Sequence, residues 1–313
     1  GMCRFLVFVG ARPILLADLL THPSRSIIHQ SYACKLRTES HGGSASLNGD
    51  GFGVGWYTGE HITPCLFNSI APAWNNRNLH RLAEKVTAAL VFAHIRAASP
   101  GSPTSESNCH PFQYKNLMFM HNGGVGDFHL IKKRLVNFVS DDVFAICQGT
   151  TDSEYCFLVF LELLTRGRRA ALEKDVEAIE CTQEELRRAL EQTVEQLKAW
   201  VCEVGSQAKS LLNFAVTDGN TVIVTRYVFP SGFQPASLFF SSGSSFARDP
   251  CDATNFRMIQ ADKRQQCHIV TSEPLTDDDN DWIEVPQNHM VTITPKSNLL
   301  LLDMDAPARL EGS

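Results

Sequence analysis

The sequence opens on a short apolar run, MCRFLVFVG, at residues 2–10. Its aromatic and β-branched residues, closed by Gly10, are typical of a buried strand. If Met2 is the initiator, a methionine aminopeptidase is expected to remove it, because the side chain of Cys3 is small. Gly1 is then expected to be a remnant of a cleaved tag, and Cys3 becomes the first residue of the mature chain.

A cysteine with a free α-amine carries a nucleophile and a base in one residue. The ordinary pKa of such an amine is about 7.7–8.0 and that of a thiol is about 8.5, so both exchange protons near neutral pH. Proteins use this arrangement as an activated N-terminal nucleophile. Cysteine is also among the most buried residue types, so Cys3 taken alone fits a core position equally well.

Composition narrows the class of protein. The chain has 313 residues, of which 43% are hydrophobic, enough for a large core. Its 28 Lys and Arg are outnumbered by 34 Asp and Glu, which argues against nucleic-acid binding. The opening apolar run is too short for a signal peptide, and no segment has the length and hydropathy of a membrane span.

The ten cysteines are scattered along the chain without a Cys-x-x-Cys pair. No cysteine and histidine spacing matches a zinc site, so the sequence predicts neither a metal nor another cofactor. Unpaired thiols in this pattern are typical of a reducing compartment, and we therefore expect a cytosolic protein.

Periodicity predicts strands first, helices in the middle and strands again, which indicates a single α+β domain over residues 1–313. A polar segment at 35–47 is expected to be a mobile surface loop, and 277–281 a solvated acidic loop. Thr151 and Thr182 each begin a capping box, and 218–220 has the composition of a hairpin turn. A short helix or turn is expected at 24–30. The expected helices are 79–89, 151–164 and 182–204; the expected strands are 4–9, 90–94, 117–120, 211–217, 221–228, 237–241, 268–271, 289–294 and 298–302.

Polar residues gather where the predicted apolar strands end. Arg96 and Ser99 follow one strand, a His-Asn-Gly-Gly segment at 121–124 follows the next, and Asp152 begins a helix. Sites are often built at such positions, because backbone donors become available there. Each of these residues is also common in turns, helix caps or surface ion pairs.

Taken together with Cys3, these segments resemble the class II glutamine amidotransferases, which are N-terminal-nucleophile hydrolases. Within that family, the segments at 73–76 and 108–112 are most similar to the branch associated with glutathione degradation in fungi. The resemblance implies a four-layer αββα sandwich, in which two β-sheets lie between layers of helices. The matching segments are Met2-Cys3, Asn48-Gly49-Asp50-Gly51, His94-Ile95-Arg96, Asn108-Cys109-His110-Pro111, His121-Asn122-Gly123, Thr151-Asp152-Ser153-Glu154 and, more loosely, Ser272-Glu273-Pro274-Leu275.

The resemblance also implies a reaction at Cys3. The thiol would attack the γ-amide carbonyl of a glutamyl substrate to form a γ-glutamyl thioester, while the α-amine takes and returns the proton. The Asn122 side chain and the Gly123 N–H would form the oxyanion hole, for which each donor typically contributes about 2.7–4 kcal/mol.

The substrate-binding residues carried over from the family are charged or polar. Arg96 would bind the substrate α-carboxylate through its planar guanidinium group. Asp152 would bind the α-ammonium group, His110 would lie beside the pocket, and Ser99 would add a hydrogen bond.

One departure from the family concerns the residue after Arg96. Many members carry tryptophan there as part of the gate to an acceptor site, whereas this chain has Ala97. We see no second catalytic domain within the 313 residues, so we expect the acceptor to be water or to lie on another chain. We therefore expect hydrolysis of γ-glutamyl amide bonds, in glutathione or glutamine, together with a protein partner. The alternatives are a glutaminase subunit that supplies ammonia to a separate synthetase, and a catalytically idle binding protein of the same fold.

Overall fold

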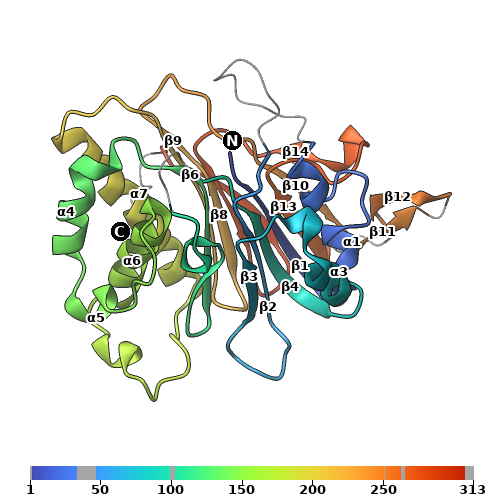
Figure 1. Ribbon diagram of the computed structural model, residues 1–313, viewed down its shortest axis with the longest axis horizontal. Coiled ribbons are helices and arrows are strands. Elements are labelled where there is room, and N and C mark those ends of the chain that lie inside the picture. Colours follow the sequence, from blue (N-terminus) through green and yellow to red (C-terminus); the bar gives the residue numbers. More distant parts are fainter. Residues whose placement is uncertain (1, 34–46, 99–102, 250, 262–264, 307–313) are drawn as a thin grey trace, which may run out of the picture.

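The computed structural model describes residues 2–33, 47–98, 103–249, 251–261 and 265–306, and in these ranges two seven-stranded antiparallel sheets form its centre (Figure 1). Ser99 and nearly all of the expected loop at 35–47 lie outside the described residues.

The first sheet has the strand order β14-β10-β13-β1-β4-β2-β3. The N-terminal strand β1 is central and pairs with β4 on one side and β13 on the other. The bounds are β1 (Arg4–Leu15), β2 (Phe52–Trp56), β3 (Cys65–Ser69), β4 (Thr87–Ile95), β10 (Phe239–Gly243), β13 (Cys267–Thr271) and β14 (Ile283–Glu284).

The second sheet has the order β16-β15-β8-β7-β6-β5, and β9 also pairs with β7. The predicted hairpin turn joins β7 to β8. A separate two-stranded hairpin, absent from the sequence prediction, is formed by β11 (Ser245–Asp249) and β12 (Asp252–Ile259). The bounds are β5 (Phe112–Tyr114), β6 (Leu117–Gly124), β7 (Ser210–Thr217), β8 (Val222–Arg226), β9 (Val228–Phe229), β15 (His289–Ile293) and β16 (Leu299–Asp303).

Helices cover the outer face of each sheet and complete the expected αββα sandwich (Figure 1). Helices α1 to α3 pack on the first sheet, and α4 to α7 lie over the second. The bounds are α1 (Ala17–Leu20), α2 (Ile27–Gln30), α3 (Arg77–Ala83), α4 (Phe128–Phe138), α5 (Asp141–Phe144), α6 (Asp152–Thr165) and α7 (Gln183–Glu203), with short 3-10 helices at Ala73–Asn75, Glu106–Asn108, Arg169–Leu172 and Asp279–Asp281.

The opening apolar run is the buried strand that the sequence predicts. Alternate residues of β1 face opposite sides of the sheet: Phe5 and Val7 pack between the two sheets, whereas Leu6 and Phe8 pack under the helices. Because both faces of β1 are buried, the run is continuously apolar instead of alternating with polar residues.

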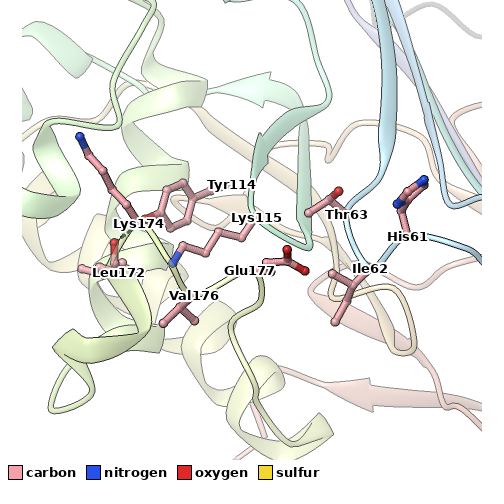
Figure 2. Close-up of a pocket in the computed structure, with 9 residues that line it drawn as sticks. All are labelled: His61, Ile62, Thr63, Tyr114, Lys115, Leu172, Lys174, Val176 and Glu177. Carbon is pink, nitrogen blue, oxygen red and sulfur yellow. Dashed lines mark hydrogen bonds between the residues drawn. The ribbon is translucent and has the colours of Figure 1, made fainter.

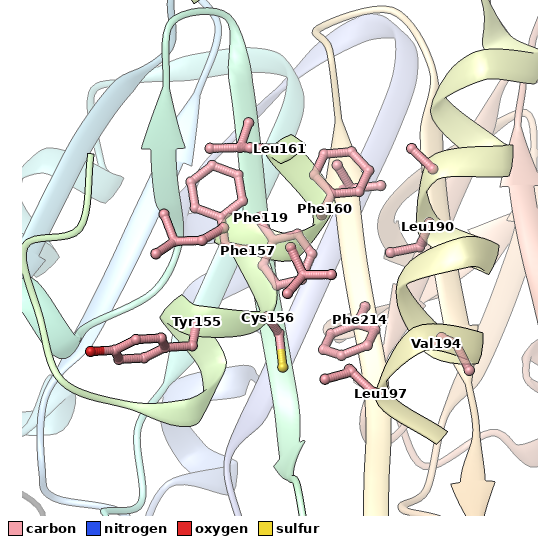
Figure 3. Packing of buried hydrophobic residues seen from close by; sticks show 14 of the residues in the cluster. Phe119, Tyr155, Cys156, Phe157, Phe160, Leu161, Leu190, Val194, Leu197 and Phe214 are labelled. Carbon is pink, nitrogen blue, oxygen red and sulfur yellow. The ribbon is translucent and has the colours of Figure 1, made fainter. Parts of the chain in front are cut away.

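The largest core cluster lies between the second sheet and its helices. Figure 3 shows Phe119 and Phe214 of this sheet meeting Phe157 and Phe160 of α6. The Phe119 and Phe157 rings stack with centroids 5.3 Å apart. Burying one such side chain typically contributes about 1.5–3 kcal/mol, so this cluster holds α6, and with it Asp152, firmly on the sheet.

The cap residues begin their helices as predicted. The side chain of Thr182 accepts from the Glu185 N–H and Glu185 reciprocates, which completes the capping box of α7. Thr151 likewise accepts from the Glu154 N–H at the start of α6. The capping box predicted at Thr151 is not completed, because the Glu154 carboxylate accepts from the N–H groups of Gln148 and Gly149 and so holds the preceding loop.

Several predicted boundaries are wrong. The opening strand, expected to end at Val9, continues to Leu15. Two further boundaries differ for a common reason. The expected helix at 79–89 already ends at Ala83, because residues 87 and 88 pair with the far end of β1 and thereby extend β4 backwards. The strand expected to stop at Met120 continues to Gly124, because residues 121–124 remain paired with β7. In both cases pairing with a distant strand overrides the local signal.

Candidate functional site

The ends of several strands meet around Cys3. This residue directly precedes β1, and the pairing of Arg4 with Ile95 sets the segment after β4 beside it. The Cys3 Sγ accepts from the Ala97 N–H at 3.3 Å and lies 3.6 Å from the Ala97 carbonyl oxygen. The thiol is therefore held next to the segment that carries Arg96.

Three charged groups act on the pKa of this thiol. Burial raises the pKa of Cys3, and the Asp152 carboxylate raises it further. The Ala97 N–H and the guanidinium groups of Arg96 and Arg4 lower the pKa, but burial prevails. A thiol in this state stays protonated near neutral pH and requires a nearby base before it can attack a carbonyl.

Arg96 is nearly fully buried, and backbone oxygens position its guanidinium group. Its Nη1 and Nη2 donate to the carbonyl oxygens of Asp50 and Pro103, each at 3.3 Å. The Asp50 carboxylate in turn accepts from the Ala98 N–H at 2.8 Å. The glycine-rich turn that contains Asp50 therefore holds the cation in place.

Asn122 and Gly123 lie at the end of β6, on the second sheet. The Asn122 Nδ2 donates to the Ser272 Oγ at 3.2 Å, and the same oxygen accepts from the Phe5 N–H at 3.0 Å. Ser272 thus links the end of β6 to the residues that follow Cys3. At Gly123, φ is +155° and a Cβ would lie 1.8 Å from the Leu211 oxygen, so only glycine fits.

Asp152 is the first residue of α6, where the positive end of the helix dipole favours a carboxylate. Its Oδ2 accepts from the Val125 N–H at 2.8 Å, and its Oδ1 accepts from the Ser153 N–H at 2.9 Å. A Cβ added to Gly124 would lie 3.4 Å from the Oδ2 atom, so this carboxylate lies against the end of β6.

A buried histidine, to which the sequence analysis assigned no role, supports this corner. The His121 Nε2–H donates to the Leu211 oxygen at 2.8 Å, which leaves Nδ1 to accept from the Ser153 hydroxyl at 2.9 Å. Burial lowers the pKa of His121, so the ring stays neutral and keeps this pattern. His121 therefore ties β6, β7 and the start of α6 together.

His110 lies in a buried aromatic cluster. Its ring centroid is 4.1 Å from that of His94 and 4.4 Å from that of Phe112. Within the described part of the chain, neither of its ring nitrogens has a hydrogen-bond partner. Burial lowers the pKa of His110 well below its usual range, so the ring is neutral.

The residues around the N-terminus include an ion-pair network that the sequence analysis missed. The Arg4 Nη2 lies 2.9 Å from the Glu273 Oε1, and the Arg25 Nη2 lies 3.6 Å from the Glu273 Oε2. Arg4 Nη1 also donates to the carbonyl oxygens of Met2 and Cys3, at 3.1 and 3.0 Å. A signal was present, since Glu273 lies in a segment that matches the family, but no local pattern connects it to Arg4.

A surface cavity of about 420 Å³ lies away from these residues (Figure 2). It is lined by the loop after β2, the turn between β5 and β6, and residues 172–177, and none of the predicted site residues lines it. Since Cys3 lies near the start of β2 and the end of β6, this cavity is at the opposite ends of those strands.

Among the residues that the structure describes, none of the helices has the length and hydropathy needed to cross a bilayer. The same described ranges contain no cluster of three or more His, Cys, Asp or Glu side chains arranged to hold a metal ion.

Sequence comparisons identify relatives over most of the chain. Residues 25–304 match the family model described as glutamine amidotransferases class-II. The chain is 43% identical to a Saccharomyces cerevisiae protein named probable glutamine amidotransferase DUG3, over 96% of this chain and 84% of the yeast protein. It is also 33% identical to the gamma-glutamyl-hercynylcysteine sulfoxide hydrolase of Mycobacterium tuberculosis, over 40% of this chain and 50% of that enzyme.

Solved structures share the fold at low sequence identity. A glutamine aminotransferase class-II domain protein from Silicibacter pomeroyi has a TM-score of 0.61 and 22% identity, over 96% of this chain and 99% of its own. The glutamine phosphoribosylpyrophosphate amidotransferase of B. subtilis has a TM-score of 0.55 and 16% identity, over 97% of this chain and 50% of its own. The family match and the yeast relative, together with the αββα sandwich, establish that this chain belongs to the class II glutamine amidotransferases, enzymes with the N-terminal-nucleophile hydrolase fold.

Proposed function

We propose that the protein hydrolyses γ-glutamyl amide bonds, in glutathione or glutamine, with Cys3 as its N-terminal nucleophile. The observation that carries this proposal is the position of the Cys3 thiol, which accepts from the N–H of Ala97, directly after the buried Arg96. The Asp152 carboxylate lies against the end of β6, next to Asn122 and Gly123, and both charged groups act on the pKa of Cys3. A cation and an anion beside one nucleophile match the α-carboxylate and α-ammonium groups of a glutamyl substrate. The name of the mycobacterial relative, a hydrolase of a γ-glutamyl compound, supports the same chemistry.

In the proposed complex, Arg96 binds the α-carboxylate and Asp152 binds the α-ammonium group. The backbone hydrogen bonds that hold both side chains reduce the cost of orienting them when the substrate binds. The γ-carbonyl oxygen then points toward the Asn122 Nδ2 and the Gly123 N–H, which stabilise the negative charge that develops on it.

The reaction then uses the α-amine of Cys3 as base and acid. The amine takes the thiol proton while Sγ attacks the γ-carbonyl carbon, and the tetrahedral intermediate collapses with cleavage of the C–N bond. The protonated amine gives its proton to the leaving nitrogen. Water attacks the thioester, again with the amine as base, which releases glutamate and restores the thiol.

Several of the sequence predictions remain part of this proposal. Residues 1–313 are proposed to act as one domain, which is supported by a first sheet that combines strands from both ends of the chain. The scattered cysteines support a cytosolic location. Ala97, in place of the family's tryptophan, favours hydrolysis over delivery of ammonia to a separate synthetase, and the protein partner rests on the family resemblance.

The test is an activity assay of protein expressed without Gly1, so that Met2 is the initiator and is removed in the cell. Intact mass confirms a Cys3 N-terminus, and glutamate release is then measured from glutathione and from glutamine, with and without candidate partners. Hydrolysis that disappears in Cys3→Ala supports the proposal. Protein with the correct N-terminus that releases glutamate from neither compound, alone or in complex, contradicts it.

Covalent labelling with a glutamine-mimicking electrophile provides the control for site identity. Cys65, Cys202 and Cys251 are exposed, so a general thiol reagent should reach them, whereas the glutamine mimic should label Cys3. Excess glutamine should protect Cys3 and leave the labelling of the exposed thiols by the general reagent unchanged. Peptide mapping distinguishes these outcomes.

A further inference from the structure

The residue that precedes the nucleophile has a defined place in the fold. The side chain of Met2 packs against an apolar patch formed by Leu211, Val228 and Ala236. Its carbonyl oxygen accepts from the Asn48 Nδ2 at 2.8 Å and from the Arg4 Nη1 at 3.1 Å. Both the side chain and the carbonyl group of this aminoacyl residue therefore have partners.

Met2 also occupies the position that the leaving group of a substrate would take beside the α-amine of Cys3. In the proposed reaction the α-amine of Cys3 gives a proton to the leaving nitrogen, which requires the two nitrogens to come within about 3 Å of each other. Met2 is attached to that same α-amine in the unprocessed chain. Its removal therefore opens space next to the proton donor, bordered by the apolar patch and the two N–H donors.

From this arrangement we infer a leaving-group subsite, formed by Leu211, Val228, Ala236, Asn48 and Arg4, that accepts an amino-acid residue with an unbranched apolar side chain. The inference rests on the proposed function and narrows its substrate class to γ-glutamyl amino acids and peptides. The apolar patch would cover the side chain of the departing residue, and Asn48 and Arg4 would bind its carbonyl or carboxylate oxygen. Glutamine, whose leaving group is ammonia, would leave this subsite unused.

The patch has the properties that such a subsite needs. Val228 and Ala236 are 1% and 0% exposed, and Met2 packs against them, so an apolar substrate side chain that takes the place of Met2 would be buried on the same residues. The Ala236 backbone is fixed, because its carbonyl oxygen accepts from the Asn213 Nδ2 at 3.2 Å and from the Arg226 Nε at 3.0 Å. A patch held in this way is preorganised for binding.

The first experiment compares kcat/KM for three substrates of the processed enzyme: glutamine, γ-Glu-Gly and γ-Glu-Met. Burial of the methionine side chain predicts a kcat/KM for γ-Glu-Met about 10- to 100-fold above that for γ-Glu-Gly. Equal values for the two dipeptides would overturn the subsite and leave the proposed hydrolysis intact.

Variants of the patch test its position. Val228→Ala should reduce the preference for γ-Glu-Met over γ-Glu-Gly by about fivefold or more. Ala236→Val should impair γ-Glu-Met selectively by filling the space. Val216→Ala is the matched control for lost stability. Val216 lies on the face of β7 opposite to Leu211, in the core cluster under the helices, so this variant should leave the preference unchanged. A preference that none of the patch variants alters would contradict the assignment.

Binding to Cys3→Ala keeps the inference testable if no substrate is turned over. Calorimetry with this variant, processed to expose Ala at position 3, should show tighter binding of γ-Glu-Met than of γ-Glu-Gly. That result would support the subsite even if hydrolysis failed, whereas equal affinities would reject it on independent grounds.

Discussion

Replacement of His110 by phenylalanine separates a structural role from the predicted substrate-binding role. The ring lies between those of His94 and Phe112, and in the described residues its two nitrogens have no hydrogen-bond partner. A phenyl ring can occupy this position without breaking a hydrogen bond and removes two buried polar atoms. His110→Phe should therefore be at least as stable as the wild type at pH 7.

The larger effect of this substitution is expected in acid. Burial lowers the pKa of His110 well below its usual range, and that of the adjacent His94 to about 3. In the unfolded chain each histidine has a pKa of about 6.5 and takes up a proton as the pH falls. The free energy of unfolding therefore has its full value above pH 6.5. Below this pH it decreases by about 1.4 kcal/mol per pH unit for each histidine that stays neutral in the folded protein. At pH 5, each such histidine lowers the free energy of unfolding by about 2 kcal/mol.

Urea unfolding at pH 7 and pH 5 measures this loss. His110→Phe should lose about 2 kcal/mol less than the wild type between the two pH values. The exposed His61, replaced by glutamine, is the control and should leave the wild-type loss unchanged. A loss in His110→Phe equal to that of the wild type would refute the assignment of a buried neutral ring. A folded His110→Phe protein that no longer hydrolyses γ-glutamyl substrates would instead return His110 to the substrate site.

Three further predictions concern the N-terminus, the oxyanion hole and the helix that carries Asp152. Protein that retains Gly1 and Met2 should be inactive, because its base is locked in a peptide bond; intact mass and activity before and after trimming test this, and equal activity would count against the mechanism. Asn122→Ala should lower kcat about 10²- to 10³-fold, and unchanged steady-state kinetics would remove its side chain from the oxyanion hole. Thr151→Ala should cost about 1 kcal/mol in urea unfolding through loss of the cap of α6, and an unaltered unfolding midpoint would show that the cap contributes nothing.

Elements with strong local signals could be predicted from the sequence. The capping box at Thr182 and the hairpin turn at 218–220 are determined by residues within a few positions of each other, so they form as expected. The apolar stripe of α7 is equally local, and its residues pack in the core cluster between the helices and the second sheet. The order of the family's motifs then predicted the sandwich as a whole.

Features that depend on distant pairing could not be predicted. Nothing near residue 87 indicates that β4 begins there to pair with the end of β1. The site shows the same limit. Residues in matched motifs could be named in advance, but the bonds from Ser272 to Phe5 and from Glu273 to Arg4 span more than 260 positions of sequence.

If Cys3 is the nucleophile, as proposed, these long-range bonds would hold it in place at the terminus of the processed chain. The first residues of a chain usually fray unless they are tied down, and a loose thiol would lose the orientation on which its reactivity depends. Here β1 is paired with β4 from Arg4 and with β13 from Leu6, and Arg4 is joined to the buried carboxylate of Glu273. A buried ion pair adds little net stability, because desolvation offsets its attraction, but it fixes geometry when every donor has a partner. In the proposed mechanism, the Arg4–Glu273 pair would therefore act as an anchor that keeps Cys3 beside Arg96 once Met2 has been removed.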